Sequence, residues 1–138
     1  MSPHEDAYHK LYCYTLAHSD PSFIHQHVVD AFGAQNASEN DRSIGLTFAL
    51  VGLYLHVEKG FTGKQIQQAH AKLARNKIQW PVFQIPKDRG EINATDALMA
   101  VAGVERDQMI HNWCASVWKT FAVNRELVDS LLQSADIL

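Results

Sequence analysis

The sequence has 138 residues, 46% of them hydrophobic and 20% charged, which is typical of one globular domain and excludes a disordered chain. A net charge of -3 argues against a nucleic-acid-binding protein, because such proteins carry a basic surface. The longest apolar run, IGLTFALVGLYLHV, is shorter than the roughly 18 residues that a membrane-spanning helix needs.

Apolar residues at helical spacing predict a first helix over residues 6–17. Asp20 followed by Pro21 predicts the start of a second helix, over residues 21–35. The aspartate would accept hydrogen bonds from free backbone N–H groups, and the proline would fit the first turn.

Ser38 and Asp41 have the spacing of a capping box, which predicts the start of a third helix that runs to about residue 59. Gly60 then predicts a left-handed stop. Thr62 and Gln65 form a second capping-box pattern and predict the start of a fourth helix.

The segment QWPVFQIPKDR, residues 79–89, contains two prolines and is predicted to be extended and to lie across the helices. Three more helices are expected, over residues 95–102, 105–121 and 124–133. The sequence therefore predicts an all-α fold, with residues 1–138 forming a single-domain bundle of six or seven helices and one extended proline-containing segment.

Histidine is the unusual component, with eight residues in the chain. Two predicted helices each carry a stripe of small residues that includes one histidine. If these stripes pack together, His27 and His56 meet at one level of the bundle, although an antiparallel pairing could equally place them apart. The stripes are Ile24, His27, Ala31 and Ala34 in the second helix, and Gly45, Ala49, Gly52 and His56 in the third.

These patterns favour a polar site that binds a divalent metal or a small polar ligand, and imidazole suits zinc, iron, copper and nickel alike. If a metal binds with an open position, activation of a bound water is the most general reaction open to it. No motif fixes a reaction. The expected ligands are His18, His25, His27 and His56, with Asp30, Tyr14 and Tyr54 in support.

Each candidate also has a structural interpretation. His25 could be a core histidine that is hydrogen-bonded to a backbone carbonyl, and His18 a solvated loop residue. Asp30 could orient the imidazole of His27 three residues earlier, or face solvent.

A second arrangement would use two histidine–cysteine pairs as the nitrogen and sulfur ligands of a tetrahedral zinc site. The pairs are His9 with Cys13 and His111 with Cys114. The alternative is that both cysteines are buried as small hydrophobic residues. Two cysteines are too few for a disulfide framework, and the N-terminus MSPHEDAYHK lacks the pattern of a secretory signal. We therefore expect a cytoplasmic protein.

A different class of function is a non-catalytic interaction module, such as a homodimer that buries an aromatic patch. The preferred interpretation of the same aromatic residues is the core of the domain, which a chain of this size needs. They are Trp80, Phe83, Trp113 and Trp118.

The runs YHKLYCYTLAHSDPSFIHQHVVDAFGAQ and SIGLTFALVGLYLHVEKGFTGKQIQQAH, with the later WPVF and WCASVWKTF, resemble an uncharacterised bacterial family catalogued as domain of unknown function 5946. The resemblance extends from Tyr8 to about Leu131. It implies one soluble helical domain and no known activity. Some members begin with a cysteine-rich segment, which the opening MSPHEDAY of this sequence lacks, so the resemblance weakens the case for a cysteine-based site.

Overall fold

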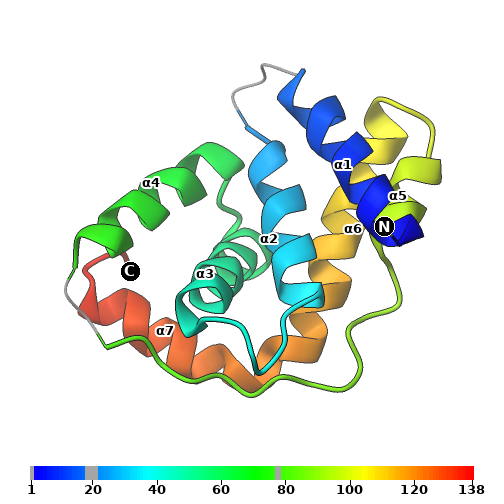
Figure 1. Ribbon diagram of the computed structural model, residues 1–138. Helices are drawn as coiled ribbons and strands as arrows, with labels where there is room; N and C mark the ends of the chain where they lie inside the picture. Colours follow the sequence, from blue (N-terminus) through cyan, green and yellow to red (C-terminus); the bar gives the residue numbers. More distant parts are fainter. Residues whose placement is uncertain (1, 18–21, 77–78) are drawn as a thin grey trace.

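The computed structural model describes residues 2–17, 22–76 and 79–138, and these residues form helices and connecting segments without any strand (Figure 1). The all-α class and the number of helices predicted from the sequence are confirmed for this part of the chain. None of its helices is long and apolar enough to cross a membrane. The helices are α1 (Pro3–Leu16), α2 (His25–Gln35), α3 (Ser43–Lys59), α4 (Gly63–Arg75), α5 (Ala94–Met99), α6 (Val104–Phe121) and α7 (Arg125–Ser134), with a 3₁₀ turn, Ala122–Asn124, before α7.

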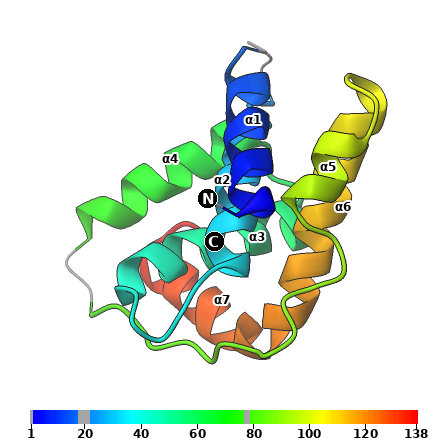
Figure 2. The same ribbon diagram turned by 45° about the vertical axis from the view of Figure 1, so that its right-hand side comes forward.

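Helix α3 lies at the centre of the fold, and every residue from Ala49 to Leu55 is buried. A helix that is apolar on all sides is expected to be covered on all sides. Helices α2, α4, α6 and α7 pack against it, while α1 and α5 form an outer layer over α2 and α6 (Figure 2).

Helices α2 and α3 run in opposite directions through the core. Their small residues allow close approach, because a Cβ on Gly52 would overlap the carboxylate of Asp30. The expected close packing at Gly45 is wrong, since this glycine is exposed and nothing lies near the place of its Cβ. The pairs in contact along the two helices are His27 with His56, Asp30 with Gly52, and Gly33 with Ala49.

The start of α2 differs from the prediction. Asp20 and Pro21 lie outside the described residues, but the helix begins only at His25, after a turn in which Phe23 has a positive φ of 50°. The turn directs backbone carbonyls towards α4, where the N–H of Lys64 donates to the oxygen of Ser22 at 3.3 Å. Contact with a neighbouring helix has therefore overridden the local helix signal.

The other helix boundaries show how well capping signals predict structure. Thr62 and Gln65 form the predicted capping box of α4, and Gly60 ends α3 in the left-handed conformation with a φ of 71°. Asp41 does accept from the backbone N–H of Ser38 at 2.8 Å. This pair forms a separate turn, however, and α3 begins two residues later than Asp41, so its prediction as the helix start is wrong.

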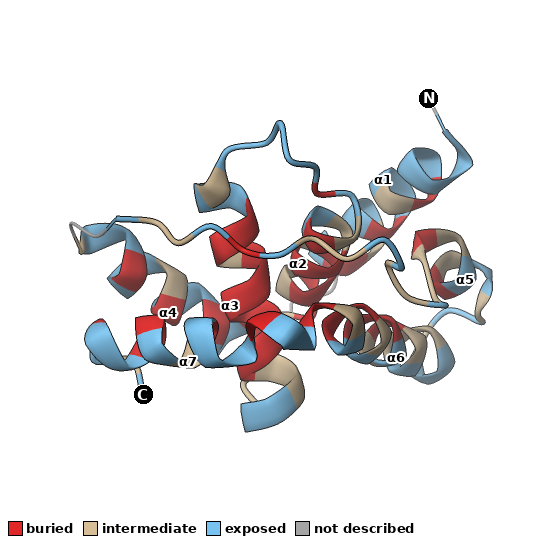
Figure 3. Cartoon of the chain, turned by 90° about the horizontal axis from the view of Figure 1, so that it is seen from below, coloured by how far each residue is buried: buried red, intermediate tan, exposed pale blue. Residues whose placement is uncertain are grey.

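Residues 79–89, predicted to be extended because of their two prolines, contain no helix, and the segment from Gln79 to Asn93 crosses the bundle between α4 and α5 (Figure 3). Asn124 pairs with both backbone groups of Gln84, at 2.8 and 2.9 Å. At the other end the side-chain amide of Gln35 donates to the carbonyls of Arg89 and Ile92. Polar side chains thus replace the regular backbone pairing that the two prolines prevent.

The aromatic residues that an interaction module would expose are part of the core. Trp113, Trp118 and Phe83 are buried, and Trp80 is partly buried against the core. The indole N–H of Trp113 donates to Gln35 at 2.9 Å, so this polar atom is satisfied within the chain. The interpretation of these four residues as part of the core is therefore confirmed, and the alternative of an exposed aromatic patch is not.

Candidate metal centre

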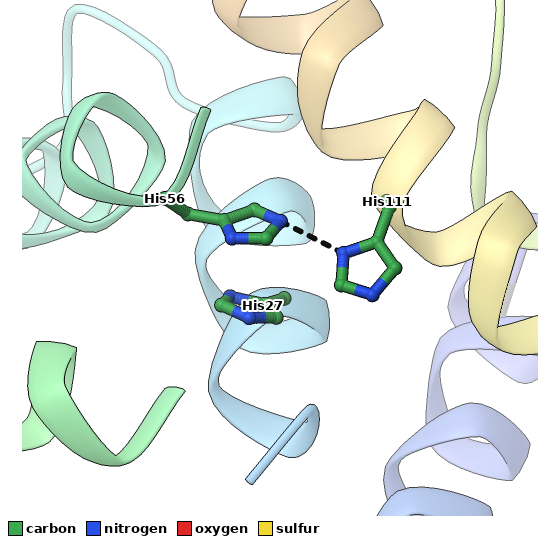
Figure 4. Close-up of side chains that lie close together, drawn as sticks. All are labelled: His27, His56 and His111. Carbon is green, nitrogen blue, oxygen red and sulfur yellow. Dashed lines mark hydrogen bonds between the residues drawn. The ribbon is translucent and has the colours of Figure 1, made fainter. Parts of the chain in front are cut away.

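Three histidines from three helices meet on one side of the core: His27 in the first turn of α2, His56 in the last turn of α3, and His111 near the middle of α6 (Figure 4). One ring nitrogen from each lies within 4.8 Å of the other two. The antiparallel packing of α2 and α3 brings the beginning of one helix beside the end of the other. His27 is buried, and His56 and His111 are half-buried.

The three rings make two kinds of contact. The ring of His27 is stacked on that of His56, with centroids 3.6 Å apart and planes 22° from parallel. His111 approaches from the side, with its Nδ1 2.9 Å from Nε2 of His56. Figure 4 shows the rings of His56 and His111 turned edge to edge, with His27 on one face of the His56 ring.

The backbone beyond α3 determines the tautomer of His56. Its Nδ1 lies 3.1 Å from the carbonyl oxygen of Phe61, and because a carbonyl only accepts, Nδ1 must carry the proton. Nε2 of His56 is then an unprotonated nitrogen that faces His111, and Nδ1 of His111 donates to it. Metal-binding histidines are commonly oriented in this way, by a backbone carbonyl on the other ring nitrogen.

Burial keeps the three rings uncharged at neutral pH. It lowers the pKa of His27 to about 2, with further lowering from the positive charges that His56 and His111 would carry. Burial also lowers the pKa of His56 and of His111, although the carboxylate of Asp107 partly opposes this at His111. Neutral imidazoles are the form that binds metal ions, so no proton has to be removed from the cluster as a whole.

The arrangement fits a transition-metal ion. Ligand nitrogens about 2.0–2.1 Å from a tetrahedral ion lie roughly 3.3 Å from one another, and the His56 and His111 nitrogens are already 2.9 Å apart. An ion between them would replace the hydrogen bond, and the proton on Nδ1 of His111 would move to Nε2 of the same ring. Three protein ligands leave one tetrahedral position for water or another small ligand.

A second polar layer lies about one helical turn further along α2 and α6 than the histidines of these helices. Asp30 follows His27 by three residues on α2 and is 3% exposed, and its Oδ1 accepts from the side-chain amide of Gln26 at 3.0 Å. Cys114 follows His111 by three residues on α6 and is fully buried, and its thiol lies 3.5 Å from the backbone oxygen of His27. Burial raises the pKa of both groups, and an ionised Asp30 would raise the pKa of Cys114 further.

The sequence profile of the family of unknown function DUF5946 matches residues 5–122. This chain belongs to that family. The matched region contains the three histidines and Asp30, and it includes all of α2, α3 and α6. No curated protein and no solved structure matches the chain.

The structure brings together two of the four histidines that the sequence singled out, His27 and His56. His25 lies on another face of α2, where its Nδ1 is 2.9 Å from Oγ1 of Thr15 and its ring meets the edge of Tyr12. This is the hydrogen-bonded core position considered as its structural interpretation, and a hydrogen bond with the backbone of Tyr12 accompanies the contact with Thr15. His18 lies outside the described residues.

The three supporting residues have separate roles. Tyr54 donates to Asp129 at 2.7 Å, which links α3 to α7. Tyr14 donates to Asp107 at 3.1 Å, and so contacts the carboxylate that raises the pKa of His111. Asp30 is buried, so its interpretation as a solvent-facing charge is wrong, and its hydrogen-bond partner is Gln26.

His111 is the residue that the sequence-based site left out, since it appeared only with Cys114 in the zinc alternative. A signal for it was present, because His111 lies on the same helix face as the buried residues Cys114 and Trp118. The two histidine–cysteine pairs do not converge. His9 and Cys13 are exposed on α1, and the described part of the chain forms one compact ligand group, which contains neither.

Proposed function

We propose that this protein binds a divalent transition-metal ion through His27, His56 and His111. The observation that carries the proposal is the convergence of three ring nitrogens, from three helices, within 4.8 Å of one another. Helix bundles commonly hold metal ions in this way, between side chains that face one another across the core.

The chemistry of the three groups supports an ion rather than packing alone. All three imidazoles are kept uncharged by burial, and the unprotonated nitrogen of His56 is directed towards the cluster by the contact with Phe61. Imidazole ligands suit zinc, copper, iron and nickel, and a site with three such ligands retains an open position. The reaction class that such a centre offers is activation of a bound water, or binding of a small polar ligand at that position.

We also propose a cytoplasmic location, which the free thiols of Cys13 and Cys114 support because they are compatible with a reducing compartment. This placement also bears on the metal, because cytoplasmic proteins compete for ions with the other ligands of the cell. Affinity alone therefore does not identify the ion, and it has to be measured in protein isolated from cells.

Elemental analysis by mass spectrometry of untagged protein, purified without chelator, tests the proposal. We expect close to one ion per chain, which EDTA dialysis removes and added metal restores. His27→Ala, His56→Ala and His111→Ala should each lose the ion.

The matched control is His25→Ala, which removes a buried histidine from α2 without touching the cluster. It should retain the ion, whereas loss of the ion in this variant would favour the site predicted from sequence alone. Circular dichroism of each variant shows whether its helices remain. If the intact protein holds no metal when isolated, and binds none of Zn²⁺, Co²⁺, Ni²⁺, Cu²⁺ or Fe²⁺ in titrations, the proposal is wrong.

A further inference from the structure

One carboxyl oxygen in the core has no hydrogen-bond partner. Asp30 is 3% exposed, and while its Oδ1 accepts from Gln26, its Oδ2 is buried without any partner. A buried polar atom in this state costs free energy, so its presence calls for an explanation in function. Asp30 lies three residues after His27 on the same helix, which is a rise of about 4.5 Å along the axis.

The neighbouring helix is shaped to hold this carboxyl group. Gly52 of α3 lies directly against it, and a Cβ at that position would overlap Oδ2. Gly52 is itself one turn before His56, so the carboxyl group lies between the two helices that supply the stacked histidines. An alanine at position 52 would leave no room for the aspartate in this position.

Among the residues that the structure describes, no positively charged group acts on Asp30. Gln26 on its own helix donates one hydrogen bond, Gly52 faces it from α3, and Cys114 and Tyr8 are the titratable groups nearby on α6 and α1. A carboxylate without a cation is strongly disfavoured in a protein interior, so Asp30 holds its proton in the metal-free protein. The burial that raises its pKa agrees with this state.

A bound ion would favour the ionised form of Asp30 over the protonated form. Three neutral imidazoles leave the full charge of a divalent ion uncompensated in a largely buried place, and such an ion becomes the largest local charge. The adjacent carboxyl group can compensate it by becoming an anion. Gly52 leaves room for this group about one helical turn from His27 on α2 and from His56 on α3.

We propose that Asp30 is the charge-compensating residue of the metal centre, protonated when the site is empty and ionised when the ion is bound. This inference rests on the proposed function. The step is a simple ionisation: the O–H bond of the carboxyl group breaks, both electrons remain on oxygen, and the proton passes to solvent. Asp30 does not contact the ion and acts through its charge.

Infrared difference spectroscopy tests the proposal on the unmodified protein. Addition of Zn²⁺ to the EDTA-treated protein should remove the carbonyl band of a buried protonated carboxylic acid and add carboxylate bands. Asp30→Asn should lack the band before and after Zn²⁺. The matched control, Asp129→Asn, removes a carboxyl group that accepts from Tyr54, and it should show the same loss of the band as the unmodified protein.

Calorimetric Zn²⁺ titrations in buffers with different ionisation enthalpies give the number of protons released per ion. Asp30→Asn should release about one proton fewer than the unmodified protein and bind Zn²⁺ about 10- to 100-fold more weakly. The comparison is made at about pH 6, where a zinc-bound water largely keeps its proton.

The two proposals fail in different ways. If Zn²⁺ does not bind to the three histidines, the proposed function fails, and this inference fails with it. If Zn²⁺ binds but the carboxylic acid band persists, or Asp30→Asn matches the unmodified protein in proton release and affinity, only the role of Asp30 is wrong. The infrared measurement needs no variant, so a poorly folded Asp30→Asn protein would not prevent the test.

Discussion

The ring of His56 donates from Nδ1 to the carbonyl oxygen of Phe61, five residues later and 3.1 Å away. Between them the chain reverses at Gly60, whose N–H donates to the oxygen of His56, while the N–H of Phe61 donates to the oxygen of Leu55. The bond from Gly60 is the one that ends a helix at a left-handed residue, and the bond from Phe61 ties the next residue to the last turns of α3. The turn that ends α3 therefore also sets which nitrogen of His56 faces the other histidines.

Gly60→Ala should impair both the helix end and the metal centre. Its φ of 71° is unfavourable for a residue with a Cβ, and we expect a loss of about 1–2 kcal/mol in the free energy of unfolding. Because Phe61 would shift, Zn²⁺ affinity should fall as well. Gly45→Ala is the control, since this glycine is exposed within α3 and should gain roughly 0.5–1 kcal/mol without any change in affinity. Equal behaviour of the two variants in urea unfolding and Zn²⁺ titration would contradict the role of the turn.

Gly52→Ala should destabilise the fold because its Cβ overlaps the carboxylate of Asp30. Overpacking of this kind typically costs roughly 1–3 kcal/mol. The double variant Gly52→Ala/Asp30→Ala should recover much of that loss, because the shortened side chain leaves room for the added methyl group. Urea unfolding of the four proteins gives the coupling energy, and strict additivity would show that the two residues do not compete for the same volume.

The stability of the metal-free protein should fall as the pH decreases below about 6.5. Burial lowers the pKa of His25 and His70, as it does for the three clustered histidines, so the unfolded chain binds more protons than the folded protein below the ordinary histidine pKa. The contribution of Asp30 to stability has the opposite sign, since its raised pKa favours the folded state as the pH falls towards 3.8. The five histidines with lowered pKa outweigh this single group.

Thermal unfolding in EDTA at pH 7.5 and 5.5 measures this effect. His70→Gln should reduce the difference in Tm between the two conditions, because glutamine can still donate to the carbonyl of Phe48 but does not take up a proton. A difference in Tm that is unchanged in His70→Gln would mean that this histidine does not contribute.

The two cysteines should differ sharply in reactivity. Cys13 is exposed on α1, whereas Cys114 is fully buried with a raised pKa, and only a thiolate reacts readily with a disulfide reagent. We expect one thiol per chain to react quickly with Ellman's reagent and the second only on unfolding. Cys13→Ser should abolish the fast phase, and a fast phase that survives in this variant would show that the core around Cys114 opens readily.

Metal binding should stabilise the folded protein. At a free Zn²⁺ concentration about 100 times the Kd, the gain is about 2.7 kcal/mol, which raises Tm by several degrees. EDTA should reverse this rise in Tm. His111→Ala should show no such increase while His70→Gln does, and a rise in Tm that persists in His111→Ala would place the ion elsewhere.

The sequence predicted the fold well where local signals act alone. The capping box at Thr62, the stop at Gly60 and the extended proline segment are all properties of a few neighbouring residues. The prediction failed at Asp41, which forms a separate turn with Ser38, and at the start of α2, which contacts α4. Capping residues mark where a helix is able to begin, but packing decides whether it does.

The same division applies to the candidate site. Small residues at helical spacing indicated that His27 and His56 lie on packing faces, but only the antiparallel register of α2 and α3 brings them together. His111 comes from a helix far along the chain, and no spacing rule links it to the other two. The contact of Gly52 with the carboxyl group of Asp30 could not be foreseen either, because it depends on a side chain of the opposite helix.

The long separation of the ligands in the sequence affects how fast the ion is released. His56 and His111 are 55 positions apart, so the cluster exists only after α6 has docked against α2 and α3. The unfolded chain offers an ion only scattered single imidazoles, which hold it weakly and exchange it fast. We therefore expect the ion to be released at the rate at which α6 separates from α2 and α3. Measuring the release of the ion would then measure the rate at which the bundle opens.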